Sequence, residues 1–147
     1  MTEIKERSER VARRLRMEGY RLTPQRMAIL QAVLESPSHL TAEEIYRQVS
    51  ADFPMLSLAT VYKTLHMLKG LGEVMELTVD GRSHYDGDAP PHPHLICVRC
   101  HTIIDLPLEM AVTVPEEALA ERGFRALWHQ VEVHGLCRQC QEETSRA

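Results

Sequence analysis

Hydrophobic residues in the first half of the chain recur at spacings of three and four, a pattern typical of amphipathic helices. Residues 3–18 are rich in helix-forming residues, and Gly19 provides a natural end to that segment. Thr23 and Pro24 then predict an N-cap followed by a proline in the first helical position. The apolar stripe of this second helix consists of Met27, Leu30 and Leu34, and the segment Ser36-Pro37-Ser38 ends it.

Two more helices follow. Residues 41–44 match a capping box, with Thr41 as the cap and Glu44 reaching back to it, and the Phe53-Pro54 pair ends the helix that this box begins. Ser57 is expected to cap a fourth helix that runs to Leu71. Its apolar face is formed by Leu58, Val61, Leu65 and Leu68.

A β-hairpin is predicted after these helices. Residues 74–79 favour a strand, and Asp80-Gly81 is a strong signal for a two-residue turn. Residues 82–86 are expected to form the returning strand. The last three of these helices, followed by a hairpin, indicate a winged helix-turn-helix, in which the segment Ser57–Leu71 would enter the major groove of DNA. A small helical domain without DNA binding would show much the same hydrophobic pattern.

The proline-containing segment 87–93 has the composition of a stiff linker. It predicts a winged-helix domain in residues 1–86 and a second domain in residues 94–147, so the fold class is α+β. The pattern in the second domain predicts, in order, a strand over 94–98, a strand over 101–106, a helix over 115–122 that Gly123 ends, and a strand over 124–133.

Charge is unevenly distributed along the chain. The net charge is −4, yet residues 1–26 carry eight lysines and arginines against four glutamates. A basic N-terminal portion can steer the protein towards phosphates, although a solvated amphipathic helix would fit equally well. The N-terminus lacks the apolar core of a secretory signal, and no apolar run approaches the roughly 20 residues of a membrane helix, so a cytoplasmic protein without membrane contact is expected.

All four cysteines lie in the second half, as two Cys-x-x-Cys pairs: Cys97 and Cys100, then Cys137 and Cys140. Two residues between thiolates allow one turn to present both sulfurs to the same ion. Two such turns complete the tetrahedral all-thiolate shell that structural zinc favours. Redox pairs or free thiols are the alternatives, but neither pair opens a helix after a buried strand as thioredoxin-like pairs do.

In these features the chain resembles the ferric uptake regulator family over about residues 10–140. The motifs that carry the resemblance are Arg21-Leu22-Thr23-Pro24-Gln25-Arg26, His39-Leu40-Thr41-Ala42-Glu43-Glu44-Ile45-Tyr46, Ser57-Leu58-Ala59-Thr60-Val61-Tyr62-Lys63-Thr64-Leu65, His92-Pro93-His94-Leu95-Ile96-Cys97-Val98-Arg99-Cys100 and His134-Gly135-Leu136-Cys137-Arg138-Gln139-Cys140. The resemblance implies a C-terminal αβ dimerisation domain and a homodimer that represses transcription at a palindromic operator in double-stranded DNA.

The resemblance also implies a regulatory metal site at His39, Asp86, His92, His94 and Asp105. Three imidazoles and two carboxylates suit Fe²⁺, Mn²⁺ or Zn²⁺, and no thiolate draws the site towards soft metals. Since these residues come from both predicted domains, one ion held by all of them would fix how the domains are oriented. Taken singly, each residue could instead be a structural histidine or a solvated acid.

Aspartate at both carboxylate positions, Asp86 and Asp105, resembles the peroxide-sensing branch of the family. That branch uses bound Fe²⁺, with Mn²⁺ as the alternative corepressor. The oxidised histidines of such relatives correspond to His39 and His92 in this chain. Zinc-sensing members add a cysteine ligand, and none is available in this chain because all four cysteines are assigned to the structural zinc site. The remaining histidines, His66, His84, His101, His129 and His134, are expected to be packing or surface residues.

Five residues are candidates for DNA contacts. Tyr62 and Lys63 match the base-reading pair of the family's recognition helix, since tyrosine can touch a thymine methyl and lysine can donate to guanine. Ser57 and Thr60 suit phosphate contacts, and Arg21 matches a basic residue that enters the minor groove.

The chain is therefore expected to be a regulator and not an enzyme. An iron- or manganese-responsive repressor without peroxide chemistry is the alternative within the family. From other classes, a zinc-ribbon metallohydrolase would leave the winged-helix half unexplained, and a thiol–disulfide redox protein would need a reversible disulfide in place of zinc.

Overall fold

The computed structural model describes residues 2–87, 92–110 and 112–146, which form two compact units. The N-terminal unit contains residues 1–77 and 83–88, and the C-terminal unit contains residues 78–82 and 89–147. Of the predicted linker over 87–93, residues 88–91 lie outside the described residues. None of the helices in the described part of the chain is both long and apolar enough to cross a bilayer.

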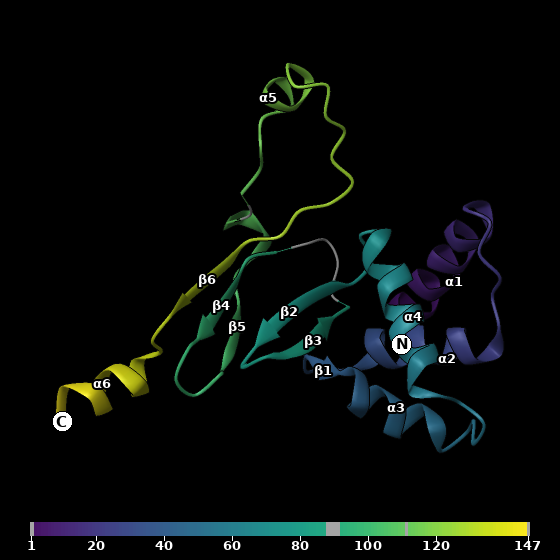
Figure 1. Ribbon diagram of the computed structural model, residues 1–147, viewed down its shortest axis with the longest axis horizontal. Coiled ribbons are helices and arrows are strands. Elements are labelled where there is room, and N and C mark those ends of the chain that lie inside the picture. Colours follow the sequence, from purple (N-terminus) through teal and green to yellow (C-terminus); the bar gives the residue numbers. More distant parts are fainter. Residues whose placement is uncertain (1, 88–91, 111, 147) are drawn as a thin grey trace. The chain divides into compact units, whose positions relative to one another are not determined.

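Four helices form most of the N-terminal unit (Figure 1). They are α1 (Thr2–Met17), α2 (Pro24–Glu35), α3 (Ala42–Ser50) and α4 (Leu58–Gly70). The three predicted caps are confirmed: Thr23, Thr41 and Ser57 each accept a backbone N–H three residues on, at 3.1, 3.2 and 3.1 Å. The capping box differs from the prediction in one detail: the Glu44 carboxylate accepts a hydrogen bond from the Thr41 hydroxyl at 3.1 Å.

The apolar faces of these helices meet in one hydrophobic core. Leu15 of α1, Leu30 of α2, Ile45 of α3 and Leu65 of α4 are each at most 1% exposed. Burying one such side chain contributes about 1.5–3 kcal/mol. The predicted stripes at spacings of three and four are therefore the surfaces that hold the helices together.

The helices are followed by the predicted hairpin. Strands β2 (Met75–Val79) and β3 (Arg82–Asp86) join a short strand β1 (Leu40–Thr41) in the order β1-β3-β2. Asp80 and Gly81 at the turn have φ angles of 52° and 72°, which a two-residue primed turn requires. This hairpin is the wing of a winged helix-turn-helix.

The C-terminal unit contains a second sheet, with β4 at its centre (Figure 1). Strand β4 (His94–Cys97) pairs antiparallel with β5 (Ile103–Asp105) and parallel with β6 (Glu132–Gly135). The helical segments of this unit are η1 (Leu108–Met110), α5 (Glu116–Ala120) and α6 (Arg138–Arg146).

The prediction of a strand over 124–133 is wrong for residues 124–131, which form no regular structure; the strand covers 132–135. A strand needs a neighbour for its backbone hydrogen bonds, and β4 pairs with β6 only from Glu132 onwards. The apolar residues that suggested a strand are largely solvent-exposed, with Phe124 at 63% and Leu127 at 69%.

Exposed apolar side chains are common in the C-terminal unit. Ile104, Val133 and Leu136 are 44%, 51% and 42% exposed, and they help to line an apolar hollow of about 230 Å³ on the sheet. Large contiguous apolar patches on a soluble protein mark interaction surfaces. This unit therefore has a surface that suits a partner.

A carboxylate joins the wing to α4. Lys69 of α4 donates to Glu76 Oε1 at 2.7 Å, and the Tyr85 hydroxyl donates to Glu76 Oε2 at 3.1 Å. The hydrogen bond from Lys69 lowers the pKa of Glu76 below its usual value of 4.5. Because the depressed pKa belongs to the folded state, this interaction stabilises the protein above the unfolded pKa, and the contribution is lost as the pH falls through the folded pKa.

We expect Glu76→Gln to reduce the free energy of unfolding at pH 7 by about 1 kcal/mol, because Lys69 and Tyr85 both lose a charged hydrogen-bond acceptor. Urea unfolding of the N-terminal unit at pH 7 and pH 3 measures this. The difference from wild type should be smaller at pH 3, because the stabilisation is lost as the pH falls through the folded-state pKa of Glu76. Glu18→Gln, at an exposed acid, is the control, and an equal loss from Glu76→Gln at both pH values would contradict the assignment.

Candidate metal centres and nucleic-acid interface

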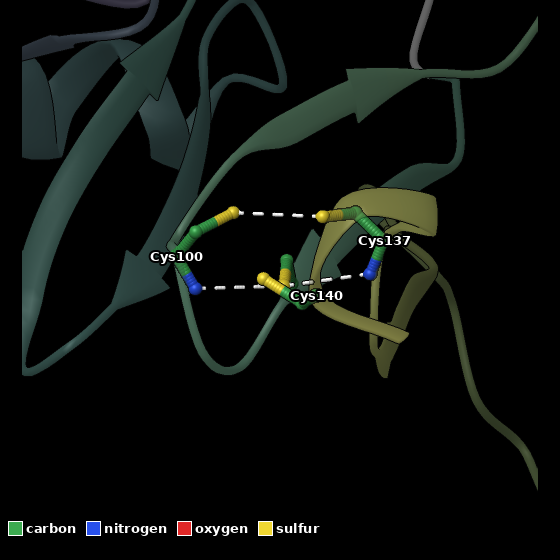
Figure 2. Close-up of side chains that lie close together, drawn as sticks. Cys100, Cys137 and Cys140 are labelled. Carbon is green, nitrogen blue, oxygen red and sulfur yellow. Dashed lines mark hydrogen bonds between the residues drawn. The ribbon is translucent and has the colours of Figure 1, made fainter. Parts of the chain in front are cut away.

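The four cysteines form a cluster in the C-terminal unit. Cys97 ends β4 and Cys100 follows in the turn before β5, while Cys137 and Cys140 lie at the start of α6. Their sulfurs all lie within 4.8 Å of one another. In Figure 2 the side chains of Cys100, Cys137 and Cys140 point towards a common centre, and the Cys100 and Cys137 sulfurs are 3.7 Å apart. The sequence prediction that the two pairs come together is confirmed.

The backbone around the cluster stabilises negative sulfur. The backbone N–H groups of Cys100 and Cys137 each donate to Cys97 Sγ at 3.5 Å, and they lower the pKa of Cys97 to about 5. The Thr102 side chain lowers the pKa of Cys100. Burial raises the pKa of Cys140 to about 12, so a thiolate at that position is favoured only beside a cation.

The donor set fits a structural zinc ion. Zinc–sulfur bonds of about 2.3 Å in a tetrahedron place the sulfurs about 3.8 Å apart, close to the Cys100–Cys137 separation. That separation is too long for a disulfide, and all four cysteines are free thiols. Arg99 holds α6 to the first pair by donating to Thr144 Oγ1 at 2.8 Å and to the Cys140 carbonyl at 3.4 Å.

Two of the predicted regulatory residues meet in the N-terminal unit. Strand β1 pairs with β3 so that Leu40 faces Tyr85, and the next positions outward are His39 and Asp86. His39 Nε2 lies 3.1 Å from Asp86 Oδ2. The Asp86 side chain is 4% exposed and the His39 side chain 16%. We call this pair the N-terminal half-site.

The other three meet in the C-terminal unit. His94 faces Asp105 across the antiparallel pair of β4 and β5, and His94 Nε2 lies 3.1 Å from Asp105 Oδ1. His92, two residues earlier on an extended segment, brings its Nε2 to 3.4 Å from the same oxygen. The two imidazole rings lie 4.5 Å apart between centroids. We call these three residues the C-terminal half-site.

Each half-site offers imidazole nitrogen and carboxylate oxygen to a cation. The buried side chain of His94 is 0% exposed, whereas Asp105 is 41% exposed. Nitrogen and oxygen donors without sulfur suit Fe²⁺, Mn²⁺ and Zn²⁺. Within each unit, the predicted residues are therefore together and chemically suited to bind a metal.

Four of the five candidate DNA-contact residues lie at the start of α4 or on it, and Arg21 lies between α1 and α2. Lys63 is exposed and Tyr62 is 41% exposed. The Tyr62 hydroxyl donates to Glu43 Oε1 of α3 at 2.9 Å, an interaction that raises the pKa of Tyr62. Ser57 and Thr60 share a hydrogen bond of 2.9 Å at the start of the helix. Arg21 is exposed, and its carbonyl accepts from Arg26.

A hollow of about 380 Å³ lies between α4 and the wing. Its lining residues are Tyr62, Lys63, His66, Lys69, Glu76 and Tyr85. Sequence reasoning treated His66 as a packing or surface histidine and did not single out Glu43 or Lys69. His66 lies three residues after Lys63, so the two side chains share one outward face of α4. That spacing could have identified His66 from the sequence.

Comparisons with known proteins place the chain in a family. Residues 17–134 match the model described as the ferric uptake regulator family. The chain is 39% identical over 130 residues to the peroxide-responsive repressor PerR of Staphylococcus aureus, a match that covers 88% of each protein.

Solved structures agree on the fold. The peroxide regulator PerR from Streptococcus pyogenes is 32% identical, with 91% of this chain and 92% of that one covered and a TM-score of 0.53. The ferric uptake regulator Fur of Helicobacter pylori has a TM-score of 0.67 at 22% identity, covering 94% and 93%, which supports the fold alone. The named relatives are transcriptional regulators and not enzymes, and this chain belongs to the ferric uptake regulator family.

Proposed function

We propose that the protein is a DNA-binding repressor whose two half-sites bind one regulatory cation, Fe²⁺ or Mn²⁺, and that Fe²⁺ in this site senses peroxide. The observation that carries the proposal is the pairing of histidine with aspartate in each unit, His39 with Asp86 and His94 with Asp105. His92 completes a ligand set of three imidazoles and two carboxylates. The 39% identity to a peroxide-responsive repressor supports the same assignment.

In this proposal residues 1–86 form the DNA-binding domain, 87–93 the hinge and 94–147 the dimerisation and metal-binding domain. A cation bound by ligands from both sides of the hinge favours one orientation of the domains. The bound ion shifts this equilibrium only through its preference for that orientation, and a switch from 1:99 to 99:1 needs about 5.5 kcal/mol.

A homodimer follows from the apolar surface of the C-terminal unit. Ile104, Val133 and Leu136 are exposed beside the hollow on the sheet. Burying this surface against a second copy removes it from water, and two-fold symmetry pairs each residue with its equivalent. A symmetric dimer presents two α4 helices, which suits a palindromic operator.

DNA binding uses the outer face of α4. The exposed Lys63 ammonium can donate to guanine, and the Tyr62 ring, held through its hydroxyl by Glu43, can contact a thymine methyl. Ser57 and Thr60 lie at the helix start, where hydroxyls and backbone N–H groups favour phosphate, and Arg21 is assigned to the minor groove.

Structural zinc is assigned to the four cysteines, which tie α6 to the first strand pair of the C-terminal unit. Fe²⁺ in the regulatory site supplies the reducing chemistry that activates peroxide. His39 and His92 are two of the proposed ligands and would be the residues oxidised there: a ring C–H bond would break, a C–O bond would form, and the second peroxide oxygen would leave as water. Oxidation of the imidazole weakens the ligand, so the domains separate and DNA is released.

The alternative is an iron- or manganese-responsive repressor without peroxide chemistry. This alternative is favoured by the ligand types, which suit Fe²⁺ and Mn²⁺ alike and do not by themselves require redox chemistry. The two functions differ only in what peroxide does to the loaded protein.

We expect Cys140→Ser to lose tightly bound zinc, because the all-thiolate shell loses one ligand at a buried position. Metal analysis after dialysis measures zinc per chain, which should be close to one in wild type. Gln139→Ser, between the same two cysteines, is the control and should retain zinc. Full zinc retention by Cys140→Ser would contradict the assignment.

We expect Lys63→Ala and Asp105→Ala to weaken DNA binding for different reasons. An operator selected from random DNA, measured by fluorescence anisotropy at fixed salt, should bind Lys63→Ala about 10-fold more weakly, with unchanged Mn²⁺ affinity. Asp105→Ala should lose Mn²⁺ affinity and, with it, the metal-dependent part of DNA binding. Unchanged operator affinity in Lys63→Ala would remove that residue from the interface.

We expect peroxide to add one oxygen to His39 or His92 in the Fe²⁺-loaded protein and to release it from the operator. Peptide mass spectrometry locates the added mass, and the Mn²⁺-loaded protein is the control that should stay unmodified and bound. If the Fe²⁺ form keeps both histidines intact and remains on DNA, the protein is the metal-responsive repressor without peroxide chemistry.

A further inference from the structure

Gly87, the residue after the ligand Asp86, is packed against α2. A Cβ atom added to Gly87 would lie 2.8 Å from Val33 Cγ1 and 2.9 Å from the Val33 carbonyl oxygen. Val33 is 4% exposed within the core, so its backbone cannot yield without moving α2. The segment therefore lies against α2 because residue 87 has no side chain.

Arg7 of α1 holds the same segment by its carbonyl. Its Nη1 donates to the Gly87 carbonyl oxygen, and its Nη2 donates to the Glu73 carbonyl oxygen at 3.0 Å. Glu73 lies just before β2, and Gly87 lies just after β3. One guanidinium thus joins the segment that enters the wing to the segment that leaves it. Its planar geometry fixes the directions of both bonds, which a lysine ammonium would not do.

The backbone of Asp86 is consequently fixed on both sides. On one side, Tyr85 is paired with Leu40 in the ladder of β1 and β3. On the other side, Gly87 is held by Arg7 and seated on Val33. The buried Asp86 carboxylate is in turn 3.1 Å from His39. A metal ligand must be held to within about 0.5 Å of its productive position, and such support comes from the residues behind it.

We infer that Arg7 is a positioning residue for the regulatory cation: through the carbonyl of Gly87 it fixes the Asp86 carboxylate in the N-terminal half-site. The inference rests on the proposed function, since it assigns a role towards the same cation. It extends that function to α1, a helix that contributes no ligand, and it makes metal affinity depend on how firmly α1 holds the start of the hinge.

The test compares Arg7→Gln, Arg7→Lys and the control Arg14→Gln in the full-length, zinc-loaded protein. Arg14 lies on the same helix and pairs with the Glu73 carboxylate at 2.8 Å. Hydrogen–deuterium exchange without Mn²⁺ should be faster over residues 83–88 in both Arg7 variants and unchanged there in Arg14→Gln. Mn²⁺ titration should show about 10-fold weaker binding in both Arg7 variants only. Arg7→Lys behaves like Arg7→Gln because the paired geometry matters, not the charge.

A second variant perturbs the segment at Gly87 and leaves Arg7 unchanged. Gly87→Ala should displace it from Val33 and give the same two changes, faster local exchange and weaker Mn²⁺ binding, with zinc content unchanged. Unchanged local exchange in the Arg7 variants, unchanged Mn²⁺ affinity despite faster exchange, or faster exchange across the whole N-terminal unit would each overturn the positioning role. Failure of the proposed function is seen separately, as an absence of Mn²⁺ binding at these ligands in wild type.

Discussion

Antiparallel strand register is the constraint on which both half-sites depend. In the N-terminal unit, the two-residue strand β1 aligns with β3 so that His39 comes beside Asp86. In the C-terminal unit, the register of β4 with β5 places His94 opposite Asp105. Facing residues on paired strands have Cβ atoms about 5 Å apart, close enough to share a cation. A slip of one residue would turn one member of each pair to the other face of its sheet.

The two units are stabilised by different means. Four helices give the N-terminal unit a core of aliphatic side chains, including Leu15, Leu30 and Leu65. Among its described residues, the C-terminal unit buries few apolar side chains and leaves Phe124 and Leu127 largely exposed. Small units with little core need a metal or a second copy to be stable, and the cysteine cluster and the apolar sheet surface meet that need in the proposed zinc-loaded dimer.

Local signals in the sequence predicted the helices and the hairpin well. The caps at Thr23, Thr41 and Ser57 and the Asp80-Gly81 turn depend on neighbouring residues, so the pattern specifies them directly. The cysteine cluster was also predictable, since two Cys-x-x-Cys pairs have few other uses in such a chain. The regulatory ligands were selected by family resemblance and not by spacing, because single histidines and aspartates have many structural roles.

Other features could not be predicted because they depend on contacts that sequence spacing does not reveal. Among the described residues, the strand expected over 124–133 has no paired strand before Glu132, and the apolar residues of this segment do not disclose which strand would pair with it. Arg7 contacts Gly87, 80 residues away, and Glu43 holds Tyr62 across two helices. Arg7 looked like one of many basic residues on a solvated helix, and its proposed role depends on a glycine that composition assigned to a linker.

The placement of the cysteines also sets an order of events during synthesis. Cys100 and Cys137 are separated by 37 positions, so at about 5–20 residues per second the first pair leaves the ribosome about 2–7 s before the second. Strand β6 and α6 lie in the same late stretch. The N-terminal unit, by contrast, consists of residues 1–77 and 83–88, all of which precede the first cysteine. All residues of the helical half are thus synthesised before the second Cys-x-x-Cys pair. During that interval the first pair is exposed to oxidants and competing metals.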